Sequence, residues 1–328
     1  MNNLNFDTPI ALMFFNRPDT LKQVFESVKN VKPRKIFLVQ DGPRLGNEND
    51  IHKINSCRKI VDDIDWECDI YRNFSKTNLG VANRMSTGIS WVFEYVEKAI
   101  ILEDDCLPNL SFFYFCQELL IKYENDLRIG LISGFNYFNH FNFGGYSYGF
   151  VKSGGIWGWA TWKNRWVKYD FEMSYMNNSY LIGLIHEDIG HKSMSKHRVN
   201  DWRGRHNSVI NGTATTWAFQ WGFTRHVNSW LSIVPKHSLI MNIGLGEEAT
   251  HTKFVSKKTK YNPFFKEIKE LEKPLKIPEF VVADRNYDIA YYKLIYKSKV
   301  YIVLRKTLRF FLIKLKFTSL IKNFNFKK

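Results

Sequence analysis

AIILEDD, residues Ala99–Asp105, places three carboxylates directly after a run of four apolar side chains. A short apolar run that ends in polar turn-forming residues is typical of a buried strand, so the pattern predicts a strand over Ala99–Leu102. Glu103, Asp104 and Asp105 would then lie together where that strand ends. Open parallel sheets bind ligands beyond the carboxyl ends of their strands, so we expect the chemistry of this protein at the acidic triplet.

The residues before the triplet alternate between strand and helix patterns. Strands are expected at Ile10–Phe15, Lys35–Val39 and Cys68–Arg72, and helices from Asp19 or Thr20 to Val28, over Ile51–Ile64 and over Val81–Val96. This alternation predicts an α/β fold in which a mostly parallel sheet has helices on both faces. Asn16-Arg17 and Asp41 follow the first two strands, so they should share the sheet edge with the triplet.

The pattern becomes less regular after residue 130. A helix is expected before it at Leu110–Tyr123, and after it a strand at Ile129–Ser133, a helix at Trp217–His226 and a strand at Leu231–Val234. Residues 170–213 are polar without a clear period. Four tryptophans lie in or just after the Gly154–Trp162 segment, at positions 157, 159, 162 and 166. Either they pack in the core, or their exposed ring faces bind sugar rings. Residues 253–288 are expected to form an irregular connector, and residues 289–328 one or two helices.

Composition excludes several classes of protein. The chain has 328 residues, 45% of them hydrophobic and 24% charged, which is typical of a globular protein. Its four cysteines form no C-x-x-C pair, which argues against a disulfide scaffold or a zinc ribbon and favours a reducing, cytosolic compartment. The N-terminus lacks the pattern of a signal peptide, and no apolar stretch reaches the ~18–20 residues of a transmembrane helix.

The net charge of +15 is concentrated near the C-terminus. Residues 289–328 hold eleven Lys or Arg and no acidic residue, whereas the 36 basic residues upstream face 32 acidic ones. The excess therefore belongs to a basic amphipathic tail, and it does not indicate a nucleic-acid-binding fold. Mixed apolar and basic residues predict a helix at an anionic membrane surface, and the alternative is a helix packed on the domain with a solvated basic face.

Three candidate groups carry two interpretations each. Adjacent carboxylates at a strand end repel one another unless a cation neutralises them, and Mg²⁺ or Mn²⁺ fits an all-oxygen site; a solvated turn is the alternative. Asp41 would accept an N–H of a nucleotide base, or form the turn that its Asp-Gly-Pro sequence favours. His251 would bind a metal or phosphate, or be structural.

In combination these motifs resemble the GT-A nucleotide-sugar glycosyltransferases. The resemblance runs from Thr8 to Thr252. It is strongest to the N-acetylglucosaminyltransferase I type and to bacterial polysaccharide-cluster enzymes of the family 2 kind. It rests on five motifs: Asn16-Arg17-Pro18, Asp41-Gly42, Asn78-Leu79-Gly80 with Arg84, the acidic triplet, and Asn242–Thr252. It implies a GT-A fold, Rossmann-like, with a mostly parallel mixed sheet. Residues 1–130 would form the nucleotide-sugar half and residues 131–252 the acceptor half, followed by the 253–288 connector and the 289–328 tail.

The resemblance also implies an activity. A hexosyl or N-acetylhexosaminyl group would move, with inversion and with Mn²⁺ or Mg²⁺, from a UDP-linked sugar to a glycan or lipid-linked glycan in bacterial surface-polysaccharide synthesis. Arg17 would contact the phosphates, Asp41 the uracil, and Asp105 and His251 the metal. The complete nucleotide-sugar-binding set would be Asn16, Arg17, Asp41, Asn78, Arg84, Glu103, Asp104, Gly155 and Trp157. The enzyme would act on the inner face of the cytoplasmic membrane.

One departure from the family affects the catalytic base. The family's catalytic carboxylate would fall within Trp217–Trp221, where the sequence reads WAFQW and holds no acid. The remaining candidates are Glu248, which we favour because it lies beside His251, and then Glu247, Asp201 and Asp170; Asp104 is the other expected catalytic residue. A non-catalytic membrane-associated protein that keeps the fold therefore stays open. A sugar nucleotidyltransferase also stays open, although Phe14–Pro18 lacks the Gly-rich phosphate loop it needs.

Overall fold

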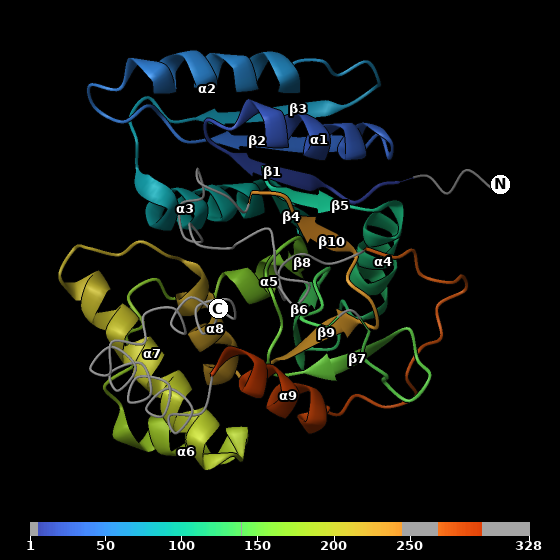
Figure 1. Cartoon of the computed structure of the whole chain (residues 1–328), viewed down its shortest axis with the longest axis vertical. Coiled ribbons are helices and arrows are strands. Elements are labelled where there is room, and N and C mark those ends of the chain that lie inside the picture. Colours follow the sequence, from blue (N-terminus) through green and yellow to red (C-terminus); the bar gives the residue numbers. More distant parts are fainter. Residues whose placement is uncertain (1–5, 139, 245–267, 297–328) are drawn as a thin grey trace, which may run out of the picture.

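The computed structural model describes residues 6–138, 140–244 and 268–296 (Figure 1). The first half contains β1 (Ile10–Phe14), α1 (Pro18–Lys29), β2 (Lys35–Gln40), α2 (Glu48–Val61), β3 (Asp69–Phe74), α3 (Gly80–Tyr95), β4 (Lys98–Glu103), β5 (Cys106–Pro108), α4 (Leu110–Lys122) and β6 (Ile129–Ser133). The second half contains β7 (Tyr148–Val151), β8 (Trp159–Trp162), α5 (Lys163–Trp166), α6 (Ser179–Ile189), α7 (Lys192–Ile210), α8 (Ala218–Val227), β9 (Leu231–Pro235), β10 (Ile240–Asn242) and α9 (Arg285–Ile295).

An eight-stranded mixed sheet forms the centre of the molecule, in the order β3-β2-β1-β4-β8-β6-β9-β7. The strands from β3 to β4 are parallel, β8 runs antiparallel to both β4 and β6, and β7 runs antiparallel to β9. β5 and β10 form a separate two-stranded ribbon. The expected Rossmann-like α/β class, with a mostly parallel sheet flanked by helices, is confirmed; the expected basic tail lies mostly outside the described residues.

Helices cover both faces of the sheet because side chains alternate along each strand. Ile10, Leu12 and Phe14 of β1 pack with α1, α2 and α4 on one face. Ala11 and Met13 point to the other face, where α3, α5 and α8 cover the sheet. The sequence predicted this alternation in the first hundred residues, and each strand and helix expected there is present within a few residues of its predicted bounds.

The polar segment 170–213 contains two helices, α6 and α7, that the sequence pattern did not predict. They pack with α8 around a third apolar cluster that includes Met194, Val199 and Trp202. In α7 only five of nineteen residues are buried and two of those are polar, so the apolar period is too sparse to recognise. The short strands β5, β7, β8 and β10 also lay outside the predicted elements.

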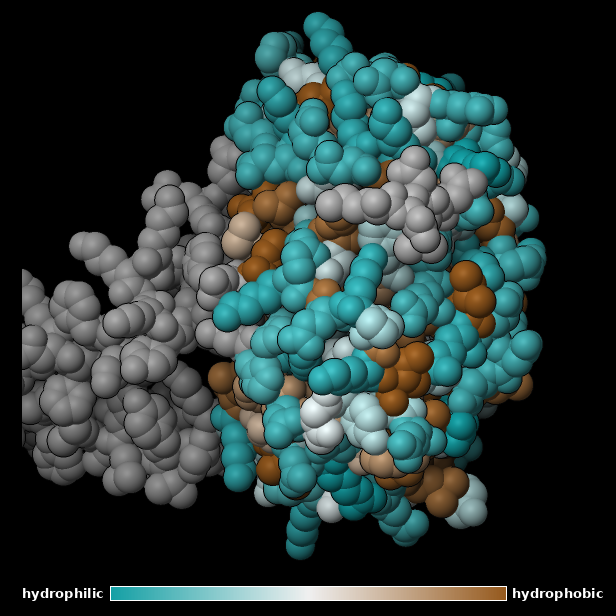
Figure 2. All heavy atoms as spheres, turned by 90° about the vertical axis from the view of Figure 1, so that its right-hand side faces the viewer, coloured by the Kyte–Doolittle hydropathy of each residue, from teal (hydrophilic) through white to brown (hydrophobic). Residues whose placement is uncertain are grey.

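Three of the four clustered tryptophans belong to the core. Trp159, Trp162 and Trp166 are each at most 3% exposed, whereas Trp157 is half-buried against Phe135. In the described part of the chain, no helix combines the length and apolar content needed to cross a bilayer. The face seen in Figure 2 is mostly hydrophilic, with hydrophobic residues in several separate groups, as on ordinary solvent-exposed surfaces.

Candidate functional site

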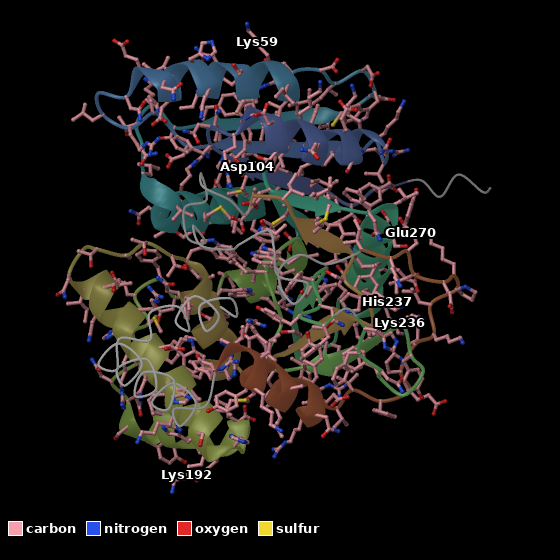
Figure 3. The ribbon with its side chains drawn as sticks, viewed as in Figure 1. Lys59, Asp104, Lys192, Lys236, His237 and Glu270 are labelled. Carbon is pink, nitrogen blue, oxygen red and sulfur yellow. The ribbon has the colours of Figure 1, made fainter. Side chains whose placement is uncertain are left out.

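A cavity of about 440 Å³ opens where β1, β2 and β4 end and α3 begins. Apolar side chains of Met13, Phe14, Val39 and Met85 form part of its wall. Seven residues expected from the sequence also line it, namely Asn16, Arg17, Asp41, Asn78, Arg84, Glu103 and Asp104. Asp104 lies near the middle of the molecule, whereas Lys59 and Lys192 point outward at its opposite ends (Figure 3).

Arg17 contacts two carboxylates of the acidic triplet. Its Nη2 lies 2.5 Å from Asp104 Oδ1 and its Nη1 lies 2.9 Å from Asp105 Oδ2. The backbone N–H of Phe15 donates to the other oxygen of Asp104, at 3.1 Å. The triplet is therefore neither a solvated turn nor wholly dependent on a metal ion for positive charge, because the arginine expected to contact phosphates already pairs with it.

One arginine does not balance three carboxylates. Burial raises the pKa of Glu103 to about 8, and repulsion from Asp105 and Asp104 adds to that effect. Burial likewise raises the pKa of Asp104 to about 6, although Arg17 opposes the increase. A raised carboxyl pKa means that the ionised form is disfavoured, so the cluster would gain from a further cation.

The donor set fits a hard divalent cation only in part. Carboxylate oxygens suit Mg²⁺ or Mn²⁺, and Mg²⁺ commonly uses one or two carboxylates together with substrate phosphates. Within the described residues, however, no three His, Cys, Asp or Glu side chains are placed to hold an ion. Asp105 keeps Oδ1, which has only a weak contact with the Cys106 thiol at 3.4 Å, and His251 lies outside the described residues.

Asp41 organises the start of α3. Its Oδ1 accepts the backbone N–H groups of Gly42 and Leu79, and its Oδ2 accepts Gly80 N–H and the Asn78 side-chain amide, all at 2.9–3.1 Å. Burial raises the pKa of Asp41, and these N–H donors oppose the increase. A carboxylate has about four acceptor positions, so an N–H of a uracil ring would have to replace one of these donors.

Asp50 is a residue of the site that the sequence did not reveal. It is 1% exposed, and it accepts hydrogen bonds from Asn16 Nδ2 at 2.7 Å and from Arg44 Nε and Nη2 at 2.7 Å each. Asn16 and Arg44 both line the cavity, so Asp50 holds two of its polar side chains in position. In the sequence Asp50 is only an acidic residue directly before the helix predicted over Ile51–Ile64.

Arg84 supplies a buried positive charge on the same cavity. It is 6% exposed and donates to the backbone oxygen of Gln40 and to the side-chain oxygen of Asn73, at 3.1 and 3.0 Å. These acceptors are neutral, and no carboxylate lies within ion-pair distance of Arg84 among the described residues. Burial accordingly lowers the pKa of Arg84, which nevertheless remains a cation at neutral pH.

The acceptor-side predictions fall on a different part of the structure. Gly155 lines a second cavity of about 160 Å³, together with Ala218 and Asp201, while Trp157 lines neither cavity. Asp170 instead accepts the N–H groups of Glu172 and Ser174 in a local turn. Glu247 and Glu248 lie outside the described residues. Among the described residues, Asp201 is therefore the candidate base that lines the same cavity as Ala218.

No protein-family model and no curated protein matches the chain. Similar solved structures include HddC from Yersinia pseudotuberculosis complexed with GMP-PN, 10% identical with a TM-score of 0.29 over 48% of this chain and 77% of that one. UDP-glucose pyrophosphorylase with UDP-glucose is 10% identical, with a TM-score of 0.32 over 50% of this chain and 79% of that one. Galactosyltransferase LgtC with donor and acceptor sugar analogues is 14% identical, with a TM-score of 0.30 over 50% of this chain and 61% of that one. Likenesses this weak carry no argument about activity, which must come from the site.

Proposed function

We propose that the chain is a nucleotide-sugar-dependent glycosyltransferase with a UDP-linked donor bound in the 440 Å³ cavity. One observation supports this proposal. Apolar side chains, three cations and two carboxylates line the same cavity, the charged residues being Arg17, Arg44, Arg84, Glu103 and Asp104. A base and ribose suit the apolar wall, and a diphosphate suits the arginines, which form charge-assisted hydrogen bonds with phosphate. Glu103 and Asp104 at the strand end would contact the ribose and the sugar.

Each residue has a proposed role in transfer. Arg17 would exchange part of its contact with Asp104 and Asp105 for the donor phosphates. Asp105, with His251, would hold Mn²⁺ or Mg²⁺, which when bound neutralises charge on the departing diphosphate. Asp41 would act mainly by positioning the first turn of α3, and through it Asn78, at the wall that receives the base.

A carboxylate base would take the proton of the acceptor hydroxyl as its oxygen bonds to the anomeric carbon and the bond from that carbon to UDP breaks. A single displacement of this kind inverts the anomeric centre. Asp201 shares the smaller cavity with Ala218, at the position where the family's acid is missing, and Glu248 is the candidate preferred from the sequence. General bases contribute about 10²–10⁴-fold in rate. We therefore expect such a loss of kcat in either Asp201→Asn or Glu248→Gln, with UDP binding unchanged in both.

The proposed acceptor is a glycan or lipid-linked glycan of a bacterial surface polysaccharide, and the donor sugar a hexosyl or N-acetylhexosaminyl group. The proposed location is the inner face of the cytoplasmic membrane, where the basic residues after 288 would contact anionic lipid. These finer assignments depend on the resemblance in sequence motifs. A sugar nucleotidyltransferase is the competing activity, and both kinds of enzyme occur among the similar solved structures.

The first test is thermal stabilisation by UDP, GDP, CMP and dTDP, each with MnCl₂ or with EDTA. UDP at 100 times its dissociation constant should stabilise the wild-type protein by about 2.7 kcal/mol. We expect this effect to require Mn²⁺ and to be lost in Asp105→Asn. Asp63→Asn is the matched control, because Asp63 is an exposed carboxylate that pairs with Lys29 away from the cavity.

The possible results separate the candidate functions. Equal stabilisation of wild type and Asp105→Asn would contradict the metal assignment. A response to another nucleotide would change the donor class, and no response to any of the four would contradict the proposed donor site. Release of pyrophosphate from UTP and a sugar 1-phosphate would identify a nucleotidyltransferase instead.

A further inference from the structure

The second cavity lies between three helices and the β7–β8 connection. Ser153–Ile156 form one wall, α7 contributes Arg198 and Asp201, α8 contributes Arg225, and α9 contributes Tyr291. It has no lining residue in common with the 440 Å³ cavity. At about 160 Å³ it is smaller than the ~300–1,000 Å³ pockets that hold drug-sized ligands, so it accommodates a single small group.

Arg225 is a buried cation without a carboxylate partner. It is 4% exposed, it donates to Ser232 Oγ and, at 3.2 Å, to the backbone oxygen of Gly154, and its Nε has no partner. A guanidinium has five N–H donors, so three of them find no acceptor in the described part of the protein. A buried charged group with unused donors is costly unless a ligand completes its contacts.

Arg198 brings a second positive charge to the same cavity. Its Nη2 donates to Ser153 Oγ at 3.2 Å, and no carboxylate among the described residues lies within ion-pair distance of it. Burial lowers the pKa of Arg225 to about 10, and the nearby charge of Arg198 contributes to the decrease. The two guanidinium groups therefore repel each other across the cavity.

The nearby carboxylates are committed to other groups. Asp201 accepts the hydroxyl of Tyr296, and Asp288 accepts the backbone N–H groups of Lys152 and Ser153. Asp188 forms an ion pair with Lys152. Asp288 attracts both arginines at longer range, but neither arginine has a carboxylate within ion-pair distance among the described residues. An anion entering the cavity would supply one.

We propose that this cavity binds an anionic group, a carboxylate or a phosphate, on the acceptor carbohydrate. The inference rests on the proposed function, since it assigns the chemical class of that acceptor. Tyr137, Trp202 and Tyr291 also line the cavity, and the guanidinium of Arg198 lies 6.0 Å from the ring centre of Trp202 and 5.8 Å from that of Tyr291. Gly158, three residues after Gly155, lies close to Leu102, so at most about 11 Å of chain separates Gly155 in the cavity wall from a residue beside the strand that carries Glu103.

The test measures binding calorimetrically with UDP and MnCl₂ present at saturation, so that the donor cavity is occupied. The probes are methyl β-D-glucuronide, glucose 6-phosphate and the neutral methyl β-D-glucoside. We expect at least one acidic probe to bind tenfold or more tightly than the glucoside, with the preferred probe distinguishing carboxylate from phosphate. Arg198→Gln should weaken that binding at least about tenfold, the range for a hydrogen bond to a charged group.

Arg203→Gln is the matched control, because Arg203 is an exposed arginine of α7 that does not line this cavity. Arg225→Lys is the second variant, since it keeps a charge at the buried position. Equal affinity for acidic and neutral probes, or equal losses in Arg198→Gln and Arg203→Gln, would overturn the inference. If Arg198→Gln lowers stability but not affinity for the acidic probe, the arginines only hold the Ser153–Gly154 backbone, and the inference also fails.

The design separates the two proposals. Acidic-probe binding without any stabilisation by UDP would leave the anion site standing and contradict the proposed donor. UDP stabilisation without discrimination among the sugar probes would support the donor site and overturn the anionic acceptor. Tighter binding of UDP-glucuronic acid than of UDP-glucose, with no discrimination among the three probes, would place the anion on the donor and overturn the acceptor assignment.

Discussion

At the scale of single residues, the sequence predicted which strand ends line the 440 Å³ cavity but not which contacts their side chains make. Asp41 is expected to read a base, and in the structure its carboxylate accepts three backbone N–H groups and an amide. Asp50 was not expected at all, because its partners Arg44 and Asn16 lie 6 and 34 residues away along the chain. Local patterns predict contacts within one helix, and they contain no information about partners on other elements.

The role of Asp50 predicts a change in both stability and ligand binding. Asp50→Asn should lower the free energy of unfolding by about 1–3 kcal/mol, the cost of losing a buried charge-assisted hydrogen bond. It should also weaken UDP binding, because Asn16 and Arg44 lose their common anchor. Asp62→Asn is the control, since Asp62 and Arg72 form an exposed pair of the kind worth about 0–1 kcal/mol. Urea unfolding with and without UDP measures both effects.

The same residue sets a dependence on pH. The Arg44 side chain is the main cause that holds the pKa of Asp50 at about 2, below the ~3.9 of an unfolded chain. A pKa lowered by folding adds stability that is complete above the unfolded value and is lost as the pH falls toward the folded value. Wild-type stability should therefore decrease between about pH 5 and 2, and Asp50→Asn should show a shallower decrease. Parallel curves for the two proteins would contradict this account.

At the scale of elements, a helix or strand could be predicted from the sequence when it buries enough apolar residues to show a pattern. The strands β1, β2 and β4 bury almost every side chain, so their apolar runs were visible. β7 and β8 have only four residues each, and α7 is mainly polar. The burial of α7 depends on neighbours such as Tyr292 and Phe223 from distant segments, which a local pattern does not contain.

α3 approaches the sheet closely at Gly88. A Cβ added there would lie 2.6 Å from Val39 Cγ1 and 2.8 Å from Met13 Cε, both on strands that form the cavity floor. Gly88→Ala should therefore destabilise the protein by about 1–3 kcal/mol, as overpacking does. Gly204→Ala in α7 meets no atom within 4 Å and should stabilise by about 0.5–1 kcal/mol. Urea unfolding of the two variants tests this, and a neutral Gly88→Ala would show that α3 moves freely on the sheet.

At the scale of the whole molecule, residues 268–296 pack against the body of the protein. Ser147 N–H donates to the backbone oxygen of Lys276, and Leu271 is 6% exposed in the main core. In α9, Tyr287 is fully buried among Phe138, Phe141 and Phe143, and Asp288 holds the β7–β8 connection. The tail was expected to begin at residue 289, which lies inside the packed helix α9. The acid-free basic composition begins there, several residues before α9 ends.

A chain that ends at Tyr296 should keep its fold and lose its membrane affinity. Residues 297–328 contain ten Lys or Arg and no acidic residue, and each basic residue near an anionic leaflet contributes about 1 kcal/mol. We expect the truncated chain to retain its melting temperature and its stabilisation by UDP, and to stop co-sedimenting with phosphatidylglycerol vesicles. A chain that ends at Asp284 is the contrasting case, since losing Tyr287 alone removes an aromatic side chain worth about 3–5 kcal/mol in a core. Vesicle binding that survives removal of residues 297–328 would place the membrane contact on the folded body instead, where the described residues carry a nearly balanced charge.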